Sequence, residues 1–174
     1  VGGVDVPVGP LAVTVQDKFR QYDWQLNMDR VTARHRFSGR FLFNRLRTPN
    51  TFEGIFPAFV GSVFNDNRSV QFSDVFTATS RFINEFRFGY RRNSSGFAVP
   101  DVTPPGGLDA FPNLKVDQLN LNIGAEDNSP QGDNQNIYQF VDQITYVRGA
   151  HTLKAGIDVR NIIAPGEFLP RARG

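Results

Sequence analysis

The feature that most constrains the fold of this chain is an alternation of apolar and polar residues with a period of two. Between Tyr22 and Asp29 the even positions are apolar and the odd positions are polar. Successive residues of a β-strand point to opposite faces, so this pattern predicts a strand with one apolar and one polar face. The same alternation recurs in five further segments: Phe37–Asn44, Val70–Thr77, Phe82–Arg91, Tyr138–Tyr146 and Leu153–Arg160.

Six strands of about nine to eleven residues are therefore expected, joined as three hairpins over about 20–45, 69–92 and 136–161. Short polar turns near 30–35, 78–81 and 148–151 close these hairpins. The connections between hairpins, about 46–68 and 93–135, are much longer, and the second is rich in Pro, Gly, Asn and Asp. In an antiparallel meander, successive connections fall at opposite ends. All long loops are thus expected at one end and all short turns at the other.

The apolar face has two possible destinations. In a soluble β-sandwich it packs against a second sheet, whereas in an outer-membrane barrel it faces lipid and the polar face lines the lumen. Strand length, segregated loops and aromatic residues near the strand ends favour the barrel. The expected lipid-facing residues are Trp24, Phe37, Phe41, Phe43, Phe86, Phe88, Tyr90, Tyr138, Phe140 and Ile157. The expected lumen-facing residues are Arg36, Arg40, Glu85, Arg87, Arg91, Lys154, Asp158 and Arg160.

Six strands are too few to close such a barrel, because single-chain bacterial barrels start at about eight. The expected fold is all-β: an antiparallel meander of about six long strands that forms an open section of a large transmembrane β-barrel. Assembly of a small barrel from several copies is the other possibility. Asp74 and Asp142 fall on the apolar parity. They lie either at the membrane interface or next to a β-bulge that turns them inward.

Composition excludes several other classes of protein. Hydrophobic residues make up 40% of the chain and charged residues 21%, which argues against wholesale disorder. No apolar run approaches the roughly 18 to 20 residues of a membrane-spanning helix. The absence of Cys excludes disulfide scaffolds and thiolate zinc sites. A net charge of +2 with dispersed cations gives no reason to expect nucleic-acid binding.

Candidate sites outside the two faces are few. His35 and His151 both fall at short turns, where solvated side chains are the simplest expectation. Glu126, Asp127 and Asp133 give the second long loop an acidic character, but they lack the spacing of a calcium loop. No phosphate-binding loop and no nucleophile–base pair is recognisable. We therefore expect no enzyme activity, no cofactor and no metal site.

Three segments carry a resemblance to a known family. INEFRFGYRRN, the later run NSPQGDNQNIYQFVDQITYVRGAHTLKAGIDVR and the earlier QLNMDRVTARHRFSGRFLFNR resemble TonB-dependent outer-membrane receptors of the Oar-like group. The resemblance extends from about Tyr22 to Asn161. It implies that residues 1–174 are part of a receptor barrel of about 22 strands in a Gram-negative outer membrane.

The resemblance also implies partners. They are the outer-membrane lipid, the remainder of the barrel, an internal plug domain, the inner-membrane TonB complex acting through that plug, and an imported ligand of unknown identity. No plug and no TonB box is recognisable in these 174 residues. The remaining alternative is a soluble extracellular β-sandwich that acts as an adhesin or binding module.

Overall fold

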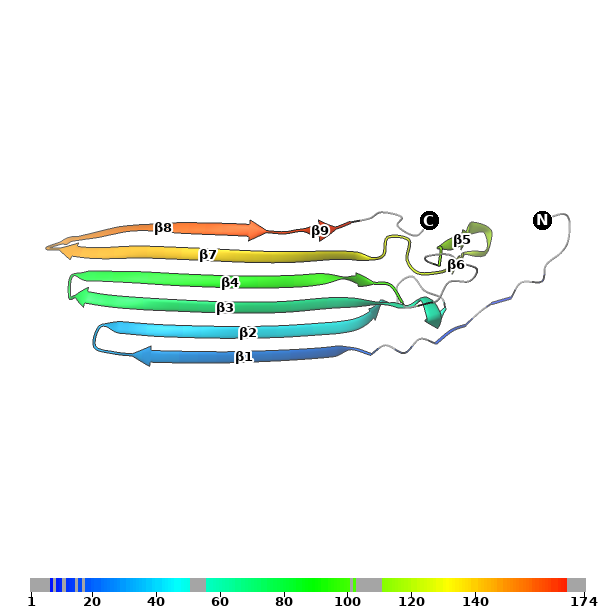
Figure 1. Cartoon of the computed structure of the whole chain (residues 1–174), viewed down its shortest axis with the longest axis horizontal. Helices are drawn as coiled ribbons and strands as arrows, with labels where there is room; N and C mark the ends of the chain where they lie inside the picture. Colours follow the sequence, from blue (N-terminus) through cyan, green and yellow to red (C-terminus); the bar gives the residue numbers. More distant parts are fainter. Residues whose placement is uncertain are drawn as a thin grey trace.

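One antiparallel sheet makes up most of the protein. The computed structural model describes residues 7, 9, 10, 12–14, 16, 18–50, 56–100, 102 and 111–168. Within these residues, seven strands form the sheet in the order β1-β2-β3-β4-β7-β8, with β9 beside β7 (Figure 1). The strands are β1 (Arg20–Val31), β2 (His35–Asn50), β3 (Gly61–Thr79), β4 (Phe82–Ala98), β7 (Gln131–Arg148), β8 (His151–Ile163) and β9 (Gly166–Glu167). The predicted all-β meander is confirmed.

The three short turns lie where the alternation predicts them, and local chemistry explains each one. The Thr32 hydroxyl accepts a hydrogen bond from the backbone N–H of His35 at 3.0 Å, which closes the β1–β2 turn. The Thr79 hydroxyl accepts the backbone N–H of Phe82 at 3.1 Å in the β3–β4 turn. In the β7–β8 turn Gly149 has a φ of 60°, a conformation that favours glycine.

The long connections all leave the opposite end of the sheet (Figure 1). Residues 51–60 join β2 to β3 and include a 3-10 turn at Pro57–Phe59. Residues 99–130 join β4 to β7 and contain a small hairpin of β5 (Leu114–Val116) and β6 (Leu121–Ile123), with a second 3-10 turn at Asp117–Leu119. The predicted segregation of short turns and long loops is therefore confirmed.

The expected strand lengths and loop boundaries need correction. The four inner strands β2, β3, β4 and β7 have 16, 19, 17 and 18 residues instead of about nine to eleven. Most of the extra residues lie at the loop end and include segments assigned above to loops, such as 46–50 and 61–68. Apolar alternation fades there while the backbone ladder continues, because neither face of that part requires apolar side chains.

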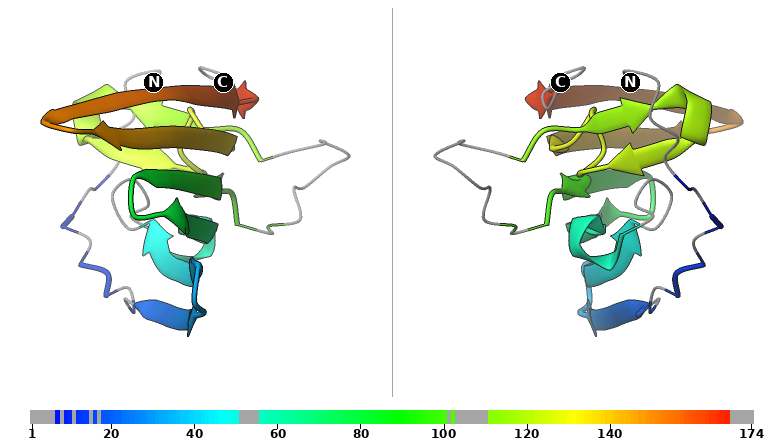
Figure 2. Two further views of the ribbon diagram at one scale, coloured as in Figure 1. Left: turned by 90° about the vertical axis from the view of Figure 1, so that its left-hand side faces the viewer. Right: turned by 90° about the vertical axis from the view of Figure 1, so that its right-hand side faces the viewer.

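The sheet has no second layer over it within the described residues. The buried residues there are Gly124, Ala125 and Ser129, the last two with 5% and 3% of their surface exposed, and all three belong to the second long loop. Viewed along the strands, the sheet is twisted and curved (Figure 2). The edge strands β1 and β8 do not pair with each other in the described structure. The protein is thus an open sheet without a conventional core.

Candidate functional site

The two faces of the sheet separate the predicted lipid-facing residues from the predicted lumen-facing ones. Residues directly opposite each other in antiparallel strands share a face. The register places Phe41, Val70, Tyr90 and Tyr138 in one row across β2, β3, β4 and β7. We call the side that carries this row the apolar face. It holds all the predicted lipid-facing residues: Trp24, Phe37, Phe41, Phe43, Phe86, Phe88, Tyr90, Tyr138, Phe140 and Ile157. The polar face holds Arg36, Arg40, Glu85, Arg87, Arg91, Lys154, Asp158 and Arg160.

The apolar face carries pairs of aromatic side chains, and no second layer of the described structure covers them. The Phe88 and Phe140 ring centroids lie 5.0 Å apart, and those of Tyr90 and Tyr138 lie 4.9 Å apart. Such tilted contacts are a favourable geometry for aromatic pairs. On the edge strands Trp24 and Ile157 remain 69% and 63% exposed. An apolar face this open is stable only against an apolar surrounding.

Aromatic residues also form a girdle along the loop side of the apolar face. Trp24 lies opposite Phe43, and the neighbouring row contains Tyr90 and Tyr138. The Tyr90 hydroxyl donates a hydrogen bond of 3.0 Å to the Asn136 side-chain oxygen. Its ring is thus on the apolar side and its hydroxyl on the wet side. This is the arrangement that suits a membrane–water interface.

Asp74 remains on the apolar face. The β2–β3 register is continuous around it, and the one shift in β3 lies beyond it, between Thr77 and Thr79. The bulge alternative is therefore excluded for Asp74. Its Oδ2 lies 2.8 Å from Nδ1 of His35. Its Oδ1 is buried and has no hydrogen-bond partner.

His35 differs from the solvated turn residue that its sequence position predicts. Its ring stacks on Phe76 with centroids 4.6 Å apart and on Phe37 at 5.2 Å. The ring joins Asp74 because β2 and β3 pair in a register that brings residues 39 positions apart into contact. His151, at the first position of β8, is exposed as expected.

Asp142 is the second carboxylate on the apolar face. The register through it is continuous on both sides, so no bulge turns it inward. Its Oδ1 accepts a hydrogen bond of 2.7 Å from the Asn84 side-chain amide, which also reaches the backbone carbonyl of Gln143 at 3.4 Å. Asp74 and Asp142 therefore each have a polar partner on the adjacent strand.

The polar face carries a network of side-chain hydrogen bonds. The Arg87 guanidinium donates to Glu85 at 2.7 Å, and Arg40 donates to the Asn27 side chain at 3.0 Å. The Gln139 amide donates to both oxygens of Asp158 at 3.0 Å. Glu85 and Arg87 therefore contact each other on the polar face and are not solvated separately.

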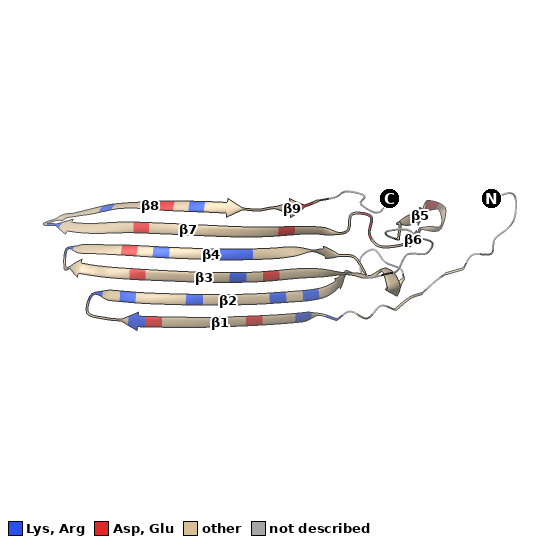
Figure 3. Ribbon diagram, viewed as in Figure 1, with Lys and Arg blue, Asp and Glu red and all other residues tan. Residues whose placement is uncertain are grey.

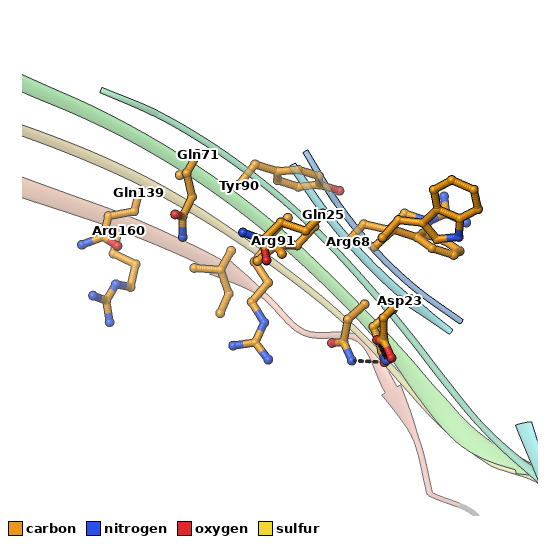
Figure 4. A pocket seen from close by; sticks show the side chains of 16 residues that line it. Asp23, Gln25, Arg68, Gln71, Tyr90, Arg91, Gln139 and Arg160 are labelled. Atoms are coloured by element: carbon orange, nitrogen blue, oxygen red, sulfur yellow. Dashed lines mark hydrogen bonds between the residues drawn. The ribbon is translucent and has the colours of Figure 1, made fainter. Parts of the chain in front are cut away.

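A shallow hollow of about 700 Å³ follows the polar face across β1, β2, β3, β4, β7 and β8. Figure 4 shows Arg91, Arg160 and Gln139 projecting from one side of the curved ribbons, while Arg68 and Tyr90 lie on the other side. Arg91 comes from β4 and Arg160 from β8. The concave side of the sheet therefore presents guanidinium and amide groups to whatever fills the space beside it.

A family model for the outer membrane β-barrel domain matches residues 10–170. The chain belongs to this family. No curated protein and no solved structure matches the chain. The barrel domain lies in the outer membrane, and its sheet is an open section of a transmembrane β-barrel. The assignment of individual side chains to lipid or lumen stays a prediction, which the separation of the two faces supports.

Membership of this family sets the orientation of the barrel domain. In outer-membrane barrels the short turns are periplasmic and the long loops are extracellular. By this rule the turns after β1, β3 and β7 are predicted to be periplasmic, and the loop ends of β2, β3, β4 and β7 are predicted to lie on the extracellular side. No helix within the described ranges is long and apolar enough to cross a bilayer.

The acidic residues of the second loop do not converge. The carboxylate of Asp127 lies 2.8 Å from the Lys115 ammonium group, and Glu126 accepts a hydrogen bond of 3.2 Å from the Ser129 hydroxyl. Asp133 lies in β7, next to the start of that strand. Across the described residues, no group of three His, Cys, Asp or Glu side chains could hold a metal ion.

Sequence reasoning missed the polar residues of the apolar face on the extracellular side of the girdle. Arg47 forms a bidentate pair with Asp66 at 2.7 and 2.9 Å, and Arg45 lies 3.5 Å from the same carboxylate. The hydrogen bonds from Arg47 hold the pKa of Asp66 below its usual value. The signal was present in the parity of β2 and β3. The prediction of a loop over 46–68 hides it, because Arg47 and Asp66 fall in that segment.

Proposed function

We propose that the barrel domain forms part of the wall of a TonB-dependent receptor of the Oar-like group and takes part in ligand uptake across the outer membrane. The sequence segments that resemble this group fall on membrane hairpins. INEFRFGYRRN lies in β4, and RGAHTLKAGIDVR covers the β7–β8 turn and most of β8. The resemblance thus concerns the elements that would build the receptor wall.

The observation that carries the proposal is the open, arginine-bearing polar face. Burying unpaired guanidinium groups in a narrow, filled barrel would cost several kcal/mol each. In the described structure Arg91 and Arg160 have no carboxylate partner, and both project from the concave side (Figure 4). A wide lumen with water or a polar plug domain satisfies them at little cost.

The proposal gives each part of the chain a role. The apolar face contacts outer-membrane lipid, and the polar face contacts the plug domain. The two extracellular loops contribute to recognition of an unidentified ligand. The edge strands β1 and β8, exposed along their whole length, pair with the remainder of the barrel. TonB acts through the plug, and the proposal includes no catalytic step, no cofactor and no nucleic acid.

The soluble β-sandwich is the alternative function class. It requires a second layer enclosing Phe41, Phe86, Phe88 and Ile157. Phe41 and Ile157 are 40% and 63% exposed, and no second sheet covers the apolar face within the described residues. The open apolar face therefore favours the membrane wall.

The experiment begins with the coding sequence on both sides of these 174 residues. The proposal expects a signal peptide, an upstream plug domain with a TonB box, and about sixteen further alternating strands. The full-length protein, purified in detergent, should then bind the purified periplasmic domain of TonB, and deletion of the TonB box should abolish binding. A gene that encodes no plug, or a full-length protein that does not bind TonB, would overturn the proposal. A barrel formed by several copies of this chain would also overturn it.

A further inference from the structure

An unusual set of arginines lies on the apolar face, at the aromatic girdle and on its loop side. The set, here named the outer arginine cluster, comes from β1, β2, β3 and β4 and consists of Arg20, Arg45, Arg47, Arg68 and Arg92. Figure 3 shows cationic positions on both halves of β2 and β4, and one on the long-loop half of β3. Asp66 is the one carboxylate on the same face of these four strands beyond the girdle.

The cluster contains two pairs of like charges placed directly opposite each other. The register pairs Arg68 with Arg92 across β3 and β4, and Arg20 with Arg47 across β1 and β2. Like charges at opposed cross-strand positions destabilise a sheet, since their side chains start only about 5 Å apart. Such pairs are tolerated where an anion lies between or beside them.

The carboxylate on the same face does not neutralise the cluster. Asp66 pairs with Arg47 at 2.7 Å and with Arg45 at 3.5 Å. Within the described residues, Arg68 and Arg92 form no ion pair with a carboxylate, although the charge of Arg68 acts on Asp66 from a greater distance, and both arginines are exposed. The Arg68 guanidinium lies over the Phe43 ring, 5.8 Å from its centroid. That contact orients the group at the girdle and leaves its donors available.

The position of the cluster indicates what the arginines meet. Arg68 and Arg92 lie one row beyond Val70 and Tyr90 on their strands, which corresponds to about 7 Å along the strand. Arg68 and Arg92 share the girdle row of Trp24 and Phe43, and the other members of the cluster lie one or two rows further toward the loops. The outward-facing guanidinium groups are therefore at the level of the lipid headgroups of the outer leaflet.

We propose that the outer arginine cluster binds the phosphate groups of phosphorylated glycolipid in the outer leaflet of the outer membrane. A guanidinium group donates two parallel hydrogen bonds to a phosphate, and these charge-assisted bonds are about twice as strong as neutral ones. A phosphate between Arg68 and Arg92 converts a repulsive pair into an attractive site. The short-turn side of the same face has no two arginines opposite each other: it carries Arg30 and Arg148 on separate strands, together with Asp74 and Asp142.

The test compares two adjacent arginines that point to opposite faces. Arg92 belongs to the cluster, whereas Arg91 lies on the polar face. The full-length barrel protein is purified in a neutral detergent and titrated with lipid A, with enzymatically dephosphorylated lipid A and with inorganic phosphate. The variants are Arg68→Gln/Arg92→Gln, Arg68→Lys/Arg92→Lys and, as the matched control, Arg91→Gln. Retention of β-structure by circular dichroism and heat-modifiable gel mobility confirm folding of each variant.

We expect the wild-type protein to bind lipid A and the double Gln variant to bind it at least about tenfold more weakly, since two charge-assisted contacts are lost. The Lys variant should retain part of the affinity, and Arg91→Gln should change it less than about twofold. Binding should weaken as salt increases. The double Gln variant should also unfold at a higher temperature than wild type without lipid A and gain less from its addition.

Three outcomes would overturn the proposal. Equal binding of lipid A and its dephosphorylated form would show that phosphate is not recognised. Equal affinity in wild type and the double Gln variant would exclude Arg68 and Arg92. Binding of inorganic phosphate as tight as that of lipid A would identify a free-anion site instead of a lipid site. If the double Gln variant does not fold, the same comparisons are made with Arg92→Gln alone.

Discussion

The two faces of the sheet are formed by the same strands, but they differ in whether their polar side chains have partners on neighbouring strands. Within the apolar band, Asp74, Asp142 and Tyr90 each have a polar partner on a neighbouring strand: His35, Asn84 and Asn136. On the polar face, Arg36, Arg91, Lys154 and Arg160 have no ion-pair partner within the described residues. Exposure does not distinguish the faces, since both are open. The difference indicates two surroundings, one that solvates charge and one that does not.

The largest expected effect comes from placing a charge on the apolar face. Phe88→Arg puts a guanidinium group in the apolar band and removes the ring that contacts Phe140. We expect a loss of about 2–4 kcal/mol in the free energy of unfolding, the cost of Arg near the bilayer midplane. The measurement is urea unfolding of the full-length barrel in lipid vesicles.

The matched control places the same charge on the polar face. Gln143 lies directly opposite Glu85, so Gln143→Arg introduces an arginine beside a carboxylate. Its unfolding free energy should remain within about 0.5 kcal/mol of wild type. Similar large losses for Phe88→Arg and Gln143→Arg would break the comparison and indicate that both faces are packed.

A smaller effect is expected from removing a polar partner on the apolar face. Asn84→Leu takes away the amide that lies 2.7 Å from the Asp142 carboxylate. The orphaned carboxylate should lower the unfolding free energy by about 1–3 kcal/mol. The double variant Asn84→Leu/Asp142→Leu should recover most of that loss, because no polar group then remains unpartnered. A double variant as unstable as Asn84→Leu would contradict this account, and the same urea series measures all three proteins.

The smallest effect is expected from breaking an ion pair on the polar face. Glu85→Gln removes the carboxylate that accepts a hydrogen bond of 2.7 Å from the Arg87 guanidinium group. The two side chains are 33% and 55% exposed, so solvent screens the pair and rehydrates Arg87. We expect a change of no more than about 0.5 kcal/mol. A loss of unfolding free energy as large as that of Asn84→Leu would show that water is excluded from the polar face.

Much of the fold was predictable from the chain alone, and the reason is local. Alternation reports which side of a strand each residue occupies, so the two faces and the three turns followed from residue order. The strand ends were not predictable in the same way. At the loop end of β2 and β3, residues such as Asn44 and Asn67 lie on the polar face and Arg45 and Arg68 lie on the apolar face, so both faces carry polar side chains there. The alternation disappears there, although backbone pairing persists.

The polar pairs on the apolar face could not be predicted from residue order. Asp74 meets His35, and Asp142 meets Asn84, across 39 and 58 positions of sequence. A shift of one residue in either register would send the partner to the opposite face. The parity of Asp74 and Asp142 was evident from the sequence, but their partners depend on the alignment of two distant strands.

Residue order by itself determined the kind of wall this chain builds: six two-faced strands with turns at one end and loops at the other. Tertiary structure decided how far the strands extend, which carboxylates are satisfied, and that Arg68 and Arg92 stand opposite each other. The physical reason is that side-chain direction along a strand is a property of the local backbone. Cross-strand neighbours are set by hydrogen-bond register between segments far apart in the chain.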